Sequence, residues 1–172
     1  MAQDITIDNL YRDAVYAQRS GDLETAAKHY RAVLKNDDTH LPALNNLAAA
    51  LIELGNTSEA FSYFQKGILH HPHSPELFGN FAKFLRDNGD LEGAILNYTK
   101  CLDQAPGLTE IRYALGIVLH KSGKLEDAKR HLHQAAKDLS ADARPLAALS
   151  AVALDLGEDE NAAFTITKAL AI

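Results

Sequence analysis

Three histidines near residue 71 are the first candidates for chemistry in this sequence. They occur as His70-His71-Pro72-His73, and imidazole nitrogens bind zinc, copper and nickel. Consecutive side chains before a proline point in different directions, and no Asp, Glu or Cys directly adjoins them. We therefore expect a solvated turn rather than a metal site. His131 and His133 lie two residues apart on a helix, hence on different faces, and we expect both at the surface.

The other reactive side chains form no catalytic set. Cys101 is the one cysteine of the chain, which excludes an internal disulfide and a multi-cysteine metal site. We expect it to be a small buried hydrophobe rather than a nucleophile. Asp155 and Glu158-Asp159-Glu160 are expected to be solvated charge at a helix start, with contact to a partner's basic patch as the alternative. No GxSxG, Walker, GxGxxG or HExxH motif occurs. The sequence predicts neither an enzyme nor a bound cofactor.

Composition narrows the class of partner. The 172 residues are 47% hydrophobic and 23% charged, as in soluble folded proteins. A net charge of −6, with acids and bases interspersed, argues against nucleic acid as the main partner. No window holds the roughly eighteen uninterrupted apolar residues that a membrane span needs. The first residues lack the basic and apolar segments of a secretory signal, so we expect a cytoplasmic protein.

An internal repeat of 34 residues organises the whole chain. Five glycines recur at this spacing, and an alanine follows each of them by five residues. No insertion or deletion interrupts the spacing. The repeats are 7–40, 41–74, 75–108, 109–142 and 143–172. The glycines are Gly21, Gly55, Gly89, Gly123 and Gly157, and the alanines are Ala26, Ala60, Ala94, Ala128 and Ala162.

Each repeat contains two blocks of apolar residues spaced three and four apart, which is the helical period. The glycine between the blocks ends the first helix, so each repeat is predicted to be a helical hairpin. Small residues at positions eight and twenty of the repeat let helices approach, and a bulky residue at position twenty-four fills the space. One hairpin cannot bury both of its faces, so neighbouring hairpins are expected to stack.

Polar residues after the repeated glycine are expected to cap the second helix of the hairpin. Asp22 and Asp90 are well suited to this role. Asn56 can also cap, with Glu59 as its capping-box partner. In the third repeat we expect the first helix to start at Ser74-Pro75, where the missing N–H of proline is harmless.

The pattern resembles the tetratricopeptide repeat family, whose unit has large-x₂-large-small-x₂-large, then Gly, Ala, an aromatic residue and Pro. The resemblance implies an all-α, right-handed α-solenoid of five hairpins that forms a single domain over residues 1–172. Asp13 and Arg112 at normally apolar positions, and Asp38 and Ser140 in place of proline, depart from the pattern. The third repeat reads Phe78-x₂-Phe81-Ala82-x₂-Leu85, Gly89, Ala94, Tyr98, Pro106, and the second reads Leu44-x₂-Leu47-Ala48-x₂-Leu51, Gly55, Ala60, Phe64, Pro72.

The resemblance further implies a protein-interaction scaffold or adaptor. The alternative is the non-catalytic targeting region of a larger enzyme, because Asn45-Asn46-Leu47-Ala48 is similar to the arrays of O-linked glycosyltransferases.

In this family the first helix of each repeat lines a concave groove that holds an extended peptide or partner protein. Asn46 and Asn80, both at position six, resemble an asparagine ladder that holds a peptide backbone, because an amide both donates and accepts hydrogen bonds. The alternative is that these asparagines bond neighbouring helices. We expect a polar groove over the first three repeats and an apolar groove over the last two. The expected binding residues are Tyr11, Arg12, Asn45, Asn46, Asn80, Lys83, Arg86, Tyr113, Ile117 and His120.

The last helix is unusually apolar for the end of a solenoid. Phe164 and Ile172 stand where earlier repeats carry mostly polar residues. We expect a downstream helix, or another chain through self-association, to cover them. Ile166 and Leu170 are expected to pack back against the preceding helices.

Overall fold

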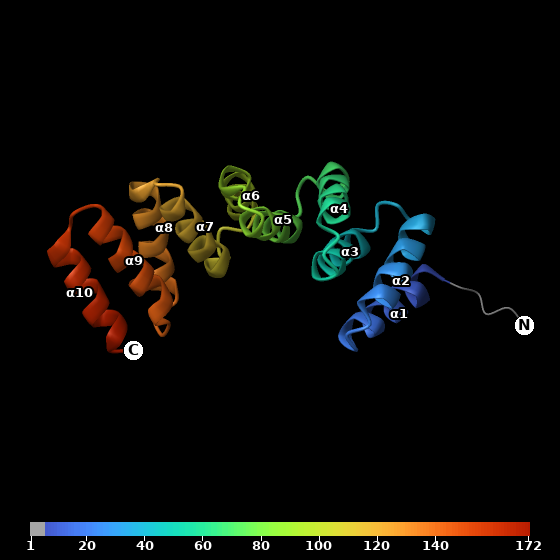
Figure 1. Cartoon of the computed structure of the whole chain (residues 1–172), viewed down its shortest axis with the longest axis horizontal. Helices are drawn as coiled ribbons and strands as arrows, with labels where there is room; N and C mark the ends of the chain where they lie inside the picture. Colours follow the sequence, from blue (N-terminus) through green and yellow to red (C-terminus); the bar gives the residue numbers. More distant parts are fainter. Residues whose placement is uncertain (1–5) are drawn as a thin grey trace, which may run out of the picture. The chain divides into compact units, whose positions relative to one another are not determined.

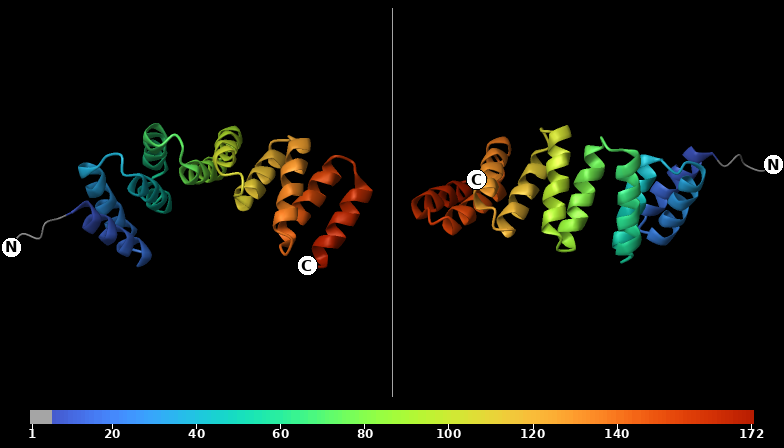
Figure 2. Two further views of the ribbon diagram at one scale, coloured as in Figure 1. Left: turned by 180° about the vertical axis from the view of Figure 1, so that it is seen from behind. Right: turned by 90° about the horizontal axis from the view of Figure 1, so that it is seen from above.

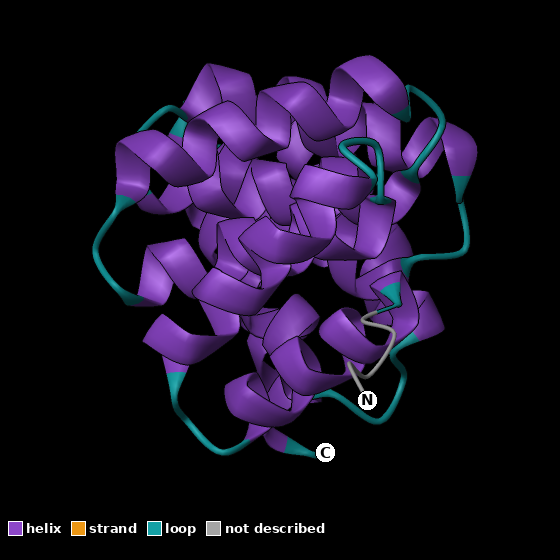
Figure 3. Cartoon of the chain, turned by 90° about the vertical axis from the view of Figure 1, so that its right-hand side faces the viewer, coloured by secondary structure: helices purple, strands orange, loops and turns teal. Residues whose placement is uncertain are grey.

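The computed structural model describes residues 6–172, and the regular structure in this range is entirely helical (Figures 1 and 3). Ten helices pair into five hairpins, one for each repeat. The prediction of an all-α helical repeat protein with five hairpins is therefore confirmed. The first helices are α1 (Ile7–Arg19), α3 (Leu41–Glu53), α5 (Pro75–Asp87), α7 (Thr109–Lys121) and α9 (Ala143–Asp155). The second helices are α2 (Leu23–Asn36), α4 (Thr57–His70), α6 (Leu91–Gln104), α8 (Leu125–Asp138) and α10 (Asp159–Leu170).

Every hairpin turns at its repeated glycine. These five glycines have φ between 75° and 84°, and no other residue type in the described range has a positive φ. Glycine suits this left-handed conformation because it has no Cβ to clash with the following carbonyl. One residue later, the backbone N–H donates to a carbonyl five residues back, as Asp22 does to Ala17 at 3.0 Å. This bond satisfies one of the carbonyls that a helix end leaves open.

The observed helix caps agree only in part with those predicted from the sequence. Asp22 and Asp90 each accept a hydrogen bond from the backbone N–H three residues on, at 3.1 and 2.9 Å. Asn56 occupies the N-cap position, but its side chain makes no cap hydrogen bond, so the expected capping box with Glu59 is wrong. The Glu59 carboxylate instead binds the Arg31 guanidinium on α2, with N–O distances of 2.8 and 2.9 Å. A charge-assisted bidentate contact is stronger than the bond to a neutral N–H that it replaces.

Small and bulky residues alternate in the core as the repeat predicts. The five alanines at position twenty are at most 2% exposed. Cys101 is fully buried, which confirms its expected packing role, and burial raises the pKa of its thiol. In the fourth hairpin Leu132 packs directly against Gly116. A Cβ at residue 116 would lie 2.6 Å from the Leu132 Cγ, so a larger residue would clash there.

The helices divide into two compact units, one ending at Leu77 and the other beginning at Phe78, so the division falls within α5. In the N-terminal unit α2 packs against α1 and α3, and α3 against α4. In the C-terminal unit, the helices from α6 to α10 each contact the next along the chain (Figure 2). The single domain expected from the sequence remains a prediction.

Arg112 and His131 place polar groups inside the fourth hairpin. Both side chains are half-buried, and neither the Arg112 Nε nor the His131 Nδ1 has a hydrogen-bond partner among the described residues. The expectation that both α8 histidines lie at the surface is right for His133 and wrong for His131. Burial, together with Arg112 and Arg130, lowers the pKa of His131. Arg112 stands at a position that is apolar in the other repeats.

The turn with three histidines is solvated only in part. His70 and His73 are exposed as expected, whereas His71 is half-buried. The His71 Nε2 lies 2.5 Å from the carbonyl oxygen of Thr39 in the preceding turn between repeats. This histidine therefore joins two successive turns.

The outer edge of α10 differs from the sequence expectation. Leu170 does not pack back, because it is 83% exposed, whereas Ile166 is covered in part and is 37% exposed. The residues at the same two positions of the third repeat, Tyr98 and Leu102, are 1% and 7% exposed. There α6 packs against α7, whereas no described helix follows α10. Ile166 and Leu170 thus belong to an unfilled interface between repeats.

Phe164 and Ile172 are also exposed, as expected, but for another reason. They stand at positions twenty-two and thirty, which face solvent in each of the earlier repeats. Their coverage by a downstream helix or another chain remains a prediction.

Candidate peptide-binding surface

We call the side chains at positions two, five, six, nine, twelve and thirteen of the repeats the first-helix surface, because they lie on α1, α3, α5, α7 and α9. In the N-terminal unit, hydrogen bonds at these positions link each first helix to the next. The Asn46 Nδ2 on α3 donates to the Tyr11 hydroxyl on α1 at 3.1 Å. The Asn45 Nδ2 donates to the Glu76 carboxylate at the start of α5 at 2.9 Å. These bonds hold the expected binding residues in defined orientations.

An aromatic cluster supports Tyr11. Its ring centroid lies 5.9 Å from that of Tyr30 and 5.1 Å from that of His40. The Tyr30 hydroxyl donates to the Gln18 side-chain oxygen at 2.5 Å, and burial raises the pKa of Tyr30 to about 12. Aromatic pairs at such distances stabilise a fixed ring geometry. Tyr11 is therefore rigidly placed beside Asn46.

The expected asparagines differ in exposure. Asn45 is 5% exposed and Asn46 is half-buried, and both bond a neighbouring first helix. Their contacts match the alternative role, which is to bond neighbouring helices. Asn80 and Arg12 are exposed.

In the C-terminal unit, α5 presents exposed Lys83, while the Arg86 guanidinium is half-buried and lies 2.8 Å from the Asp87 carboxylate. Arg86 is thus partly neutralised by its own helix. The exposed Asn80 and Lys83 are three residues apart, which places them on one face of α5.

The surface of α7 and α9 is formed by polar pairs around an apolar stretch. The His120 Nε2 lies 2.6 Å from the Asp155 carboxylate. The Arg144 guanidinium lies 5.4 Å from the centre of the Tyr113 ring and 2.9 Å from the Glu110 carboxylate. A guanidinium over a ring face is attracted by the electrons of the ring.

Between these pairs lie Ile117, which is half-buried, and Leu154, which is 56% exposed. On α9 the small side chain of Ala147 is exposed and that of Ala151 is half-buried. The stretch can therefore receive apolar side chains between two polar ends.

Sequence reasoning missed the partners Gln18, Arg144 and Asp155, the last of which was expected to be merely solvated. The sequence does contain a signal for the contact of Arg144. Glu110 and Arg144 are 34 residues apart and have opposite charge, so stacked repeats place them side by side.

The sequence model of a family described as tetratricopeptide repeat matches residues 17–79 and 85–152, more than half of the chain. The chain belongs to the tetratricopeptide repeat family. A search of curated proteins gives no significant match. Among the described residues, no helix is long and apolar enough to cross a membrane, and no three His, Cys, Asp or Glu side chains gather as metal ligands.

Solved structures share the fold of this tetratricopeptide repeat protein at low sequence identity. A MamA protein is 18% identical with a TM-score of 0.89, covering 95% of this chain and 90% of the other. MamA from Desulfovibrio magneticus RS-1 is 19% identical with a TM-score of 0.87, covering 99% and 96%. YrrB, a tetratricopeptide repeat protein with an unusual peptide-binding site, is 18% identical with a TM-score of 0.85, covering 96% and 85%.

Proposed function

We propose that this protein is an interaction scaffold that binds an extended peptide segment along its first-helix surface. The supporting observations are contacts between first helices within each unit. The Asn46 amide donates to the Tyr11 hydroxyl in the N-terminal unit, and the Arg144 guanidinium lies over the Tyr113 ring in the C-terminal unit. Side chains held in place before binding lose less entropy when a ligand arrives. The peptide-binding site of YrrB, which has a similar fold, supports the same class of function.

The two units offer different chemistry to a bound peptide. Around Asn46, amide and hydroxyl groups can exchange hydrogen bonds with a peptide main chain irrespective of its sequence. Around Ile117 and Leu154, the surface suits apolar side chains. We infer that the N-terminal unit binds a polar extended segment and that the C-terminal unit binds a segment with apolar side chains.

A peptide library displayed on phage, selected against the whole chain, provides a ligand for the test. Calorimetry with the strongest peptide should show that Asn46→Ala combined with Asn80→Ala weakens binding by about 1–3 kcal/mol, because hydrogen bonds to the main chain are lost. The matched control is Ser62→Ala combined with Thr99→Ala. These exposed residues lie on second helices and bond only their own helix.

Thermal unfolding of the same variants separates the two roles of the asparagines. The double asparagine variant loses the bond from Asn46 to Tyr11. Its melting temperature should nevertheless fall only slightly below that of the control variant, because the rings of Tyr30 and His40 still contact Tyr11. An unchanged affinity with a lowered melting temperature would show that the asparagines only bond neighbouring helices. Selected peptides that cross-link to the second helices would contradict the proposed surface.

A further inference from the structure

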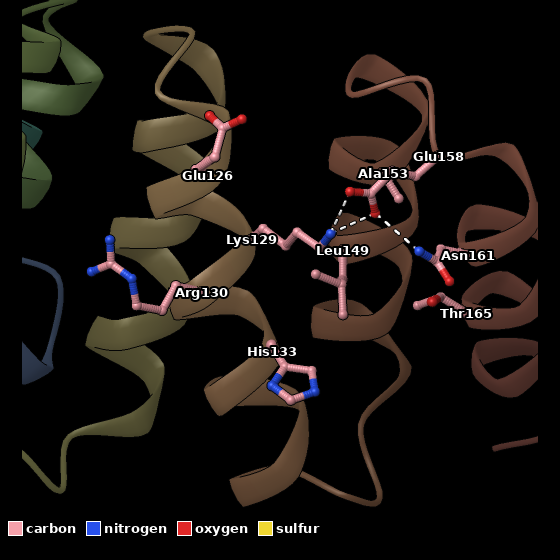
Figure 4. A pocket seen from close by; sticks show the side chains of 9 residues that line it. All are labelled: Glu126, Lys129, Arg130, His133, Leu149, Ala153, Glu158, Asn161 and Thr165. Atoms are coloured by element: carbon pink, nitrogen blue, oxygen red, sulfur yellow. Dashed lines mark hydrogen bonds and ion pairs between the residues drawn. The ribbon is translucent and has the colours of Figure 1, made fainter.

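A cavity of about 490 Å³ opens between α8 and α10 in the C-terminal unit. Its floor is formed by Leu149 and Ala153 of α9 (Figure 4). The α8 wall and the α10 wall each use side chains spaced three or four residues apart, so each wall is one helix face. The wall residues are Glu126, Lys129, Arg130 and His133 on α8, and Glu158, Asn161 and Thr165 at the start of and along α10.

The cavity occurs where a leucine of the repeat is missing. Position eleven is leucine in the second, third and fourth repeats and alanine, Ala17, in the first, and the three leucines are at most 6% exposed. In the fifth repeat this position is Ala153, which lacks the isobutyl group that would extend from the floor. Position twenty-three, which varies among the repeats, is the small Thr165 here and the bulky Tyr63 in the second repeat. The leucines are Leu51, Leu85 and Leu119.

Two of the charged residues of the cavity walls, Lys129 and Glu158, are paired with each other across the cavity. The Lys129 ammonium on α8 reaches across to the Glu158 carboxylate at 2.6 Å, and Glu158 also accepts from the Asn161 amide at 3.1 Å (Figure 4). Arg130 is paired with Asp127 on its own helix. A charged ligand would have to break these pairs, whereas a neutral apolar group would leave them intact and would keep its contact with the floor.

We propose that this cavity is a second docking site, separate from the first-helix surface, for a partner segment that inserts one branched aliphatic side chain such as leucine. The inserted side chain takes the place of the missing isobutyl group over Ala153. Because 490 Å³ exceeds the volume of a single side chain, the cavity also accommodates the adjoining main chain. The scaffold would thus hold two partners, or two segments of one partner, on different faces.

Nuclear magnetic resonance titration of the whole chain with N-acetyl-leucine methylamide tests the proposal. This neutral probe should shift the amide signals of Leu149, Ala153 and Thr165 in a saturable way, with a dissociation constant on the order of 1 mM. N-acetyl-glycine methylamide should give no saturable shift. The absence of saturation with the leucine probe would overturn the site. Equal or stronger binding of N-acetyl-phenylalanine methylamide would overturn the aliphatic assignment.

Two variants close the cavity from different sides. Ala153→Leu restores the leucine of the other repeats and should weaken the probe at least roughly tenfold. Thr165→Tyr closes the α10 wall and should do the same, which covers the case in which the first variant fails to fold. Ala163→Leu, at an exposed alanine of α10 outside the cavity, is the matched control and should bind like the parent. Retained binding in a folded variant with a closed cavity would overturn the proposal.

Discussion

At the scale of single residues, Arg112 is the clearest conflict between a side chain and its place in the repeat. Position four is Leu10, Leu44, Phe78 and Leu146 in the other repeats. The Arg112 side chain is half-buried, and its Nη2 donates to the Pro106 carbonyl at 2.5 Å. Its buried Nε has no partner among the described residues. An unpaired buried donor costs free energy that an apolar side chain would not.

Arg112→Leu should therefore raise the free energy of unfolding by about 1 kcal/mol, since it removes the unpaired donor and restores an apolar contact. Urea unfolding followed by circular dichroism measures this change. The control is Arg130→Leu, which replaces an exposed arginine on α8 and should leave stability unchanged or slightly lower. A loss of stability in Arg112→Leu would mean that the bond to Pro106 outweighs the unpaired nitrogen.

His131 should make stability depend on pH. In the unfolded chain its pKa is about 6.5, and in the folded protein burial, Arg112 and Arg130 lower the pKa, opposed by Asp127. Below pH 6.5 the unfolded chain binds more protons at this site than the folded protein does. The free energy of unfolding should consequently fall as the pH decreases from about 6.5 through the folded pKa, and His131 should have no effect above that range.

His131→Gln should flatten this part of the stability curve, measured by urea unfolding at intervals between pH 5 and pH 8 on the order of half a unit. His133→Gln, at an exposed histidine two residues away, should leave the curve unchanged. Equal flattening in both variants would assign the effect to net charge rather than to burial of His131.

At the scale of helices, two N-cap positions offer a direct comparison. Asp90 accepts a hydrogen bond from a backbone N–H of α6, whereas the Asn56 side chain makes no such bond with α4. Asp90→Ala should lower the free energy of unfolding by about 1 kcal/mol. Asn56→Ala should change it by less than about 0.5 kcal/mol. Thermal unfolding of the two variants distinguishes them, and equal losses would show that Asn56 caps α4 in solution.

The same comparison shows what the sequence could predict about helices. Helix bounds and turns follow from local signals, such as the glycine at each turn and Pro75 at the start of α5. The partner of Glu59 did not follow, because Arg31 lies in another repeat and competes with the local cap. The exposure of Leu170 was also mispredicted, because it depends on whether a further hairpin follows. The resemblance to the family predicted which side chains form the first-helix surface. Their hydrogen-bond and ion-pair partners could not be predicted, because these depend on how the repeats pack.

At the scale of the molecule, the edge formed by α10 should govern self-association. Ile166 and Leu170 occupy positions that are buried between repeats elsewhere, so a second copy can cover them. Sedimentation of the parent at increasing concentration should show association. Ile166→Ser combined with Leu170→Ser should abolish it.

Leu69→Ser, at a leucine of α4 that is 76% exposed, is the control for a general loss of apolar surface and should still associate. A parent that stays monomeric at all concentrations would contradict self-association through this edge.

The repeated glycine turns also have a kinetic consequence. Each turn joins two helices that are adjacent in the chain, and within each unit the helices that contact one another are mostly neighbours along the chain. Folding therefore requires few distant segments to find one another, which favours fast folding. Any of the hairpins can serve as the nucleus, and structure can spread from it in either direction. Backbone amides of the outermost hairpins, each supported by one neighbour, should exchange with heavy water before those of the hairpins between them.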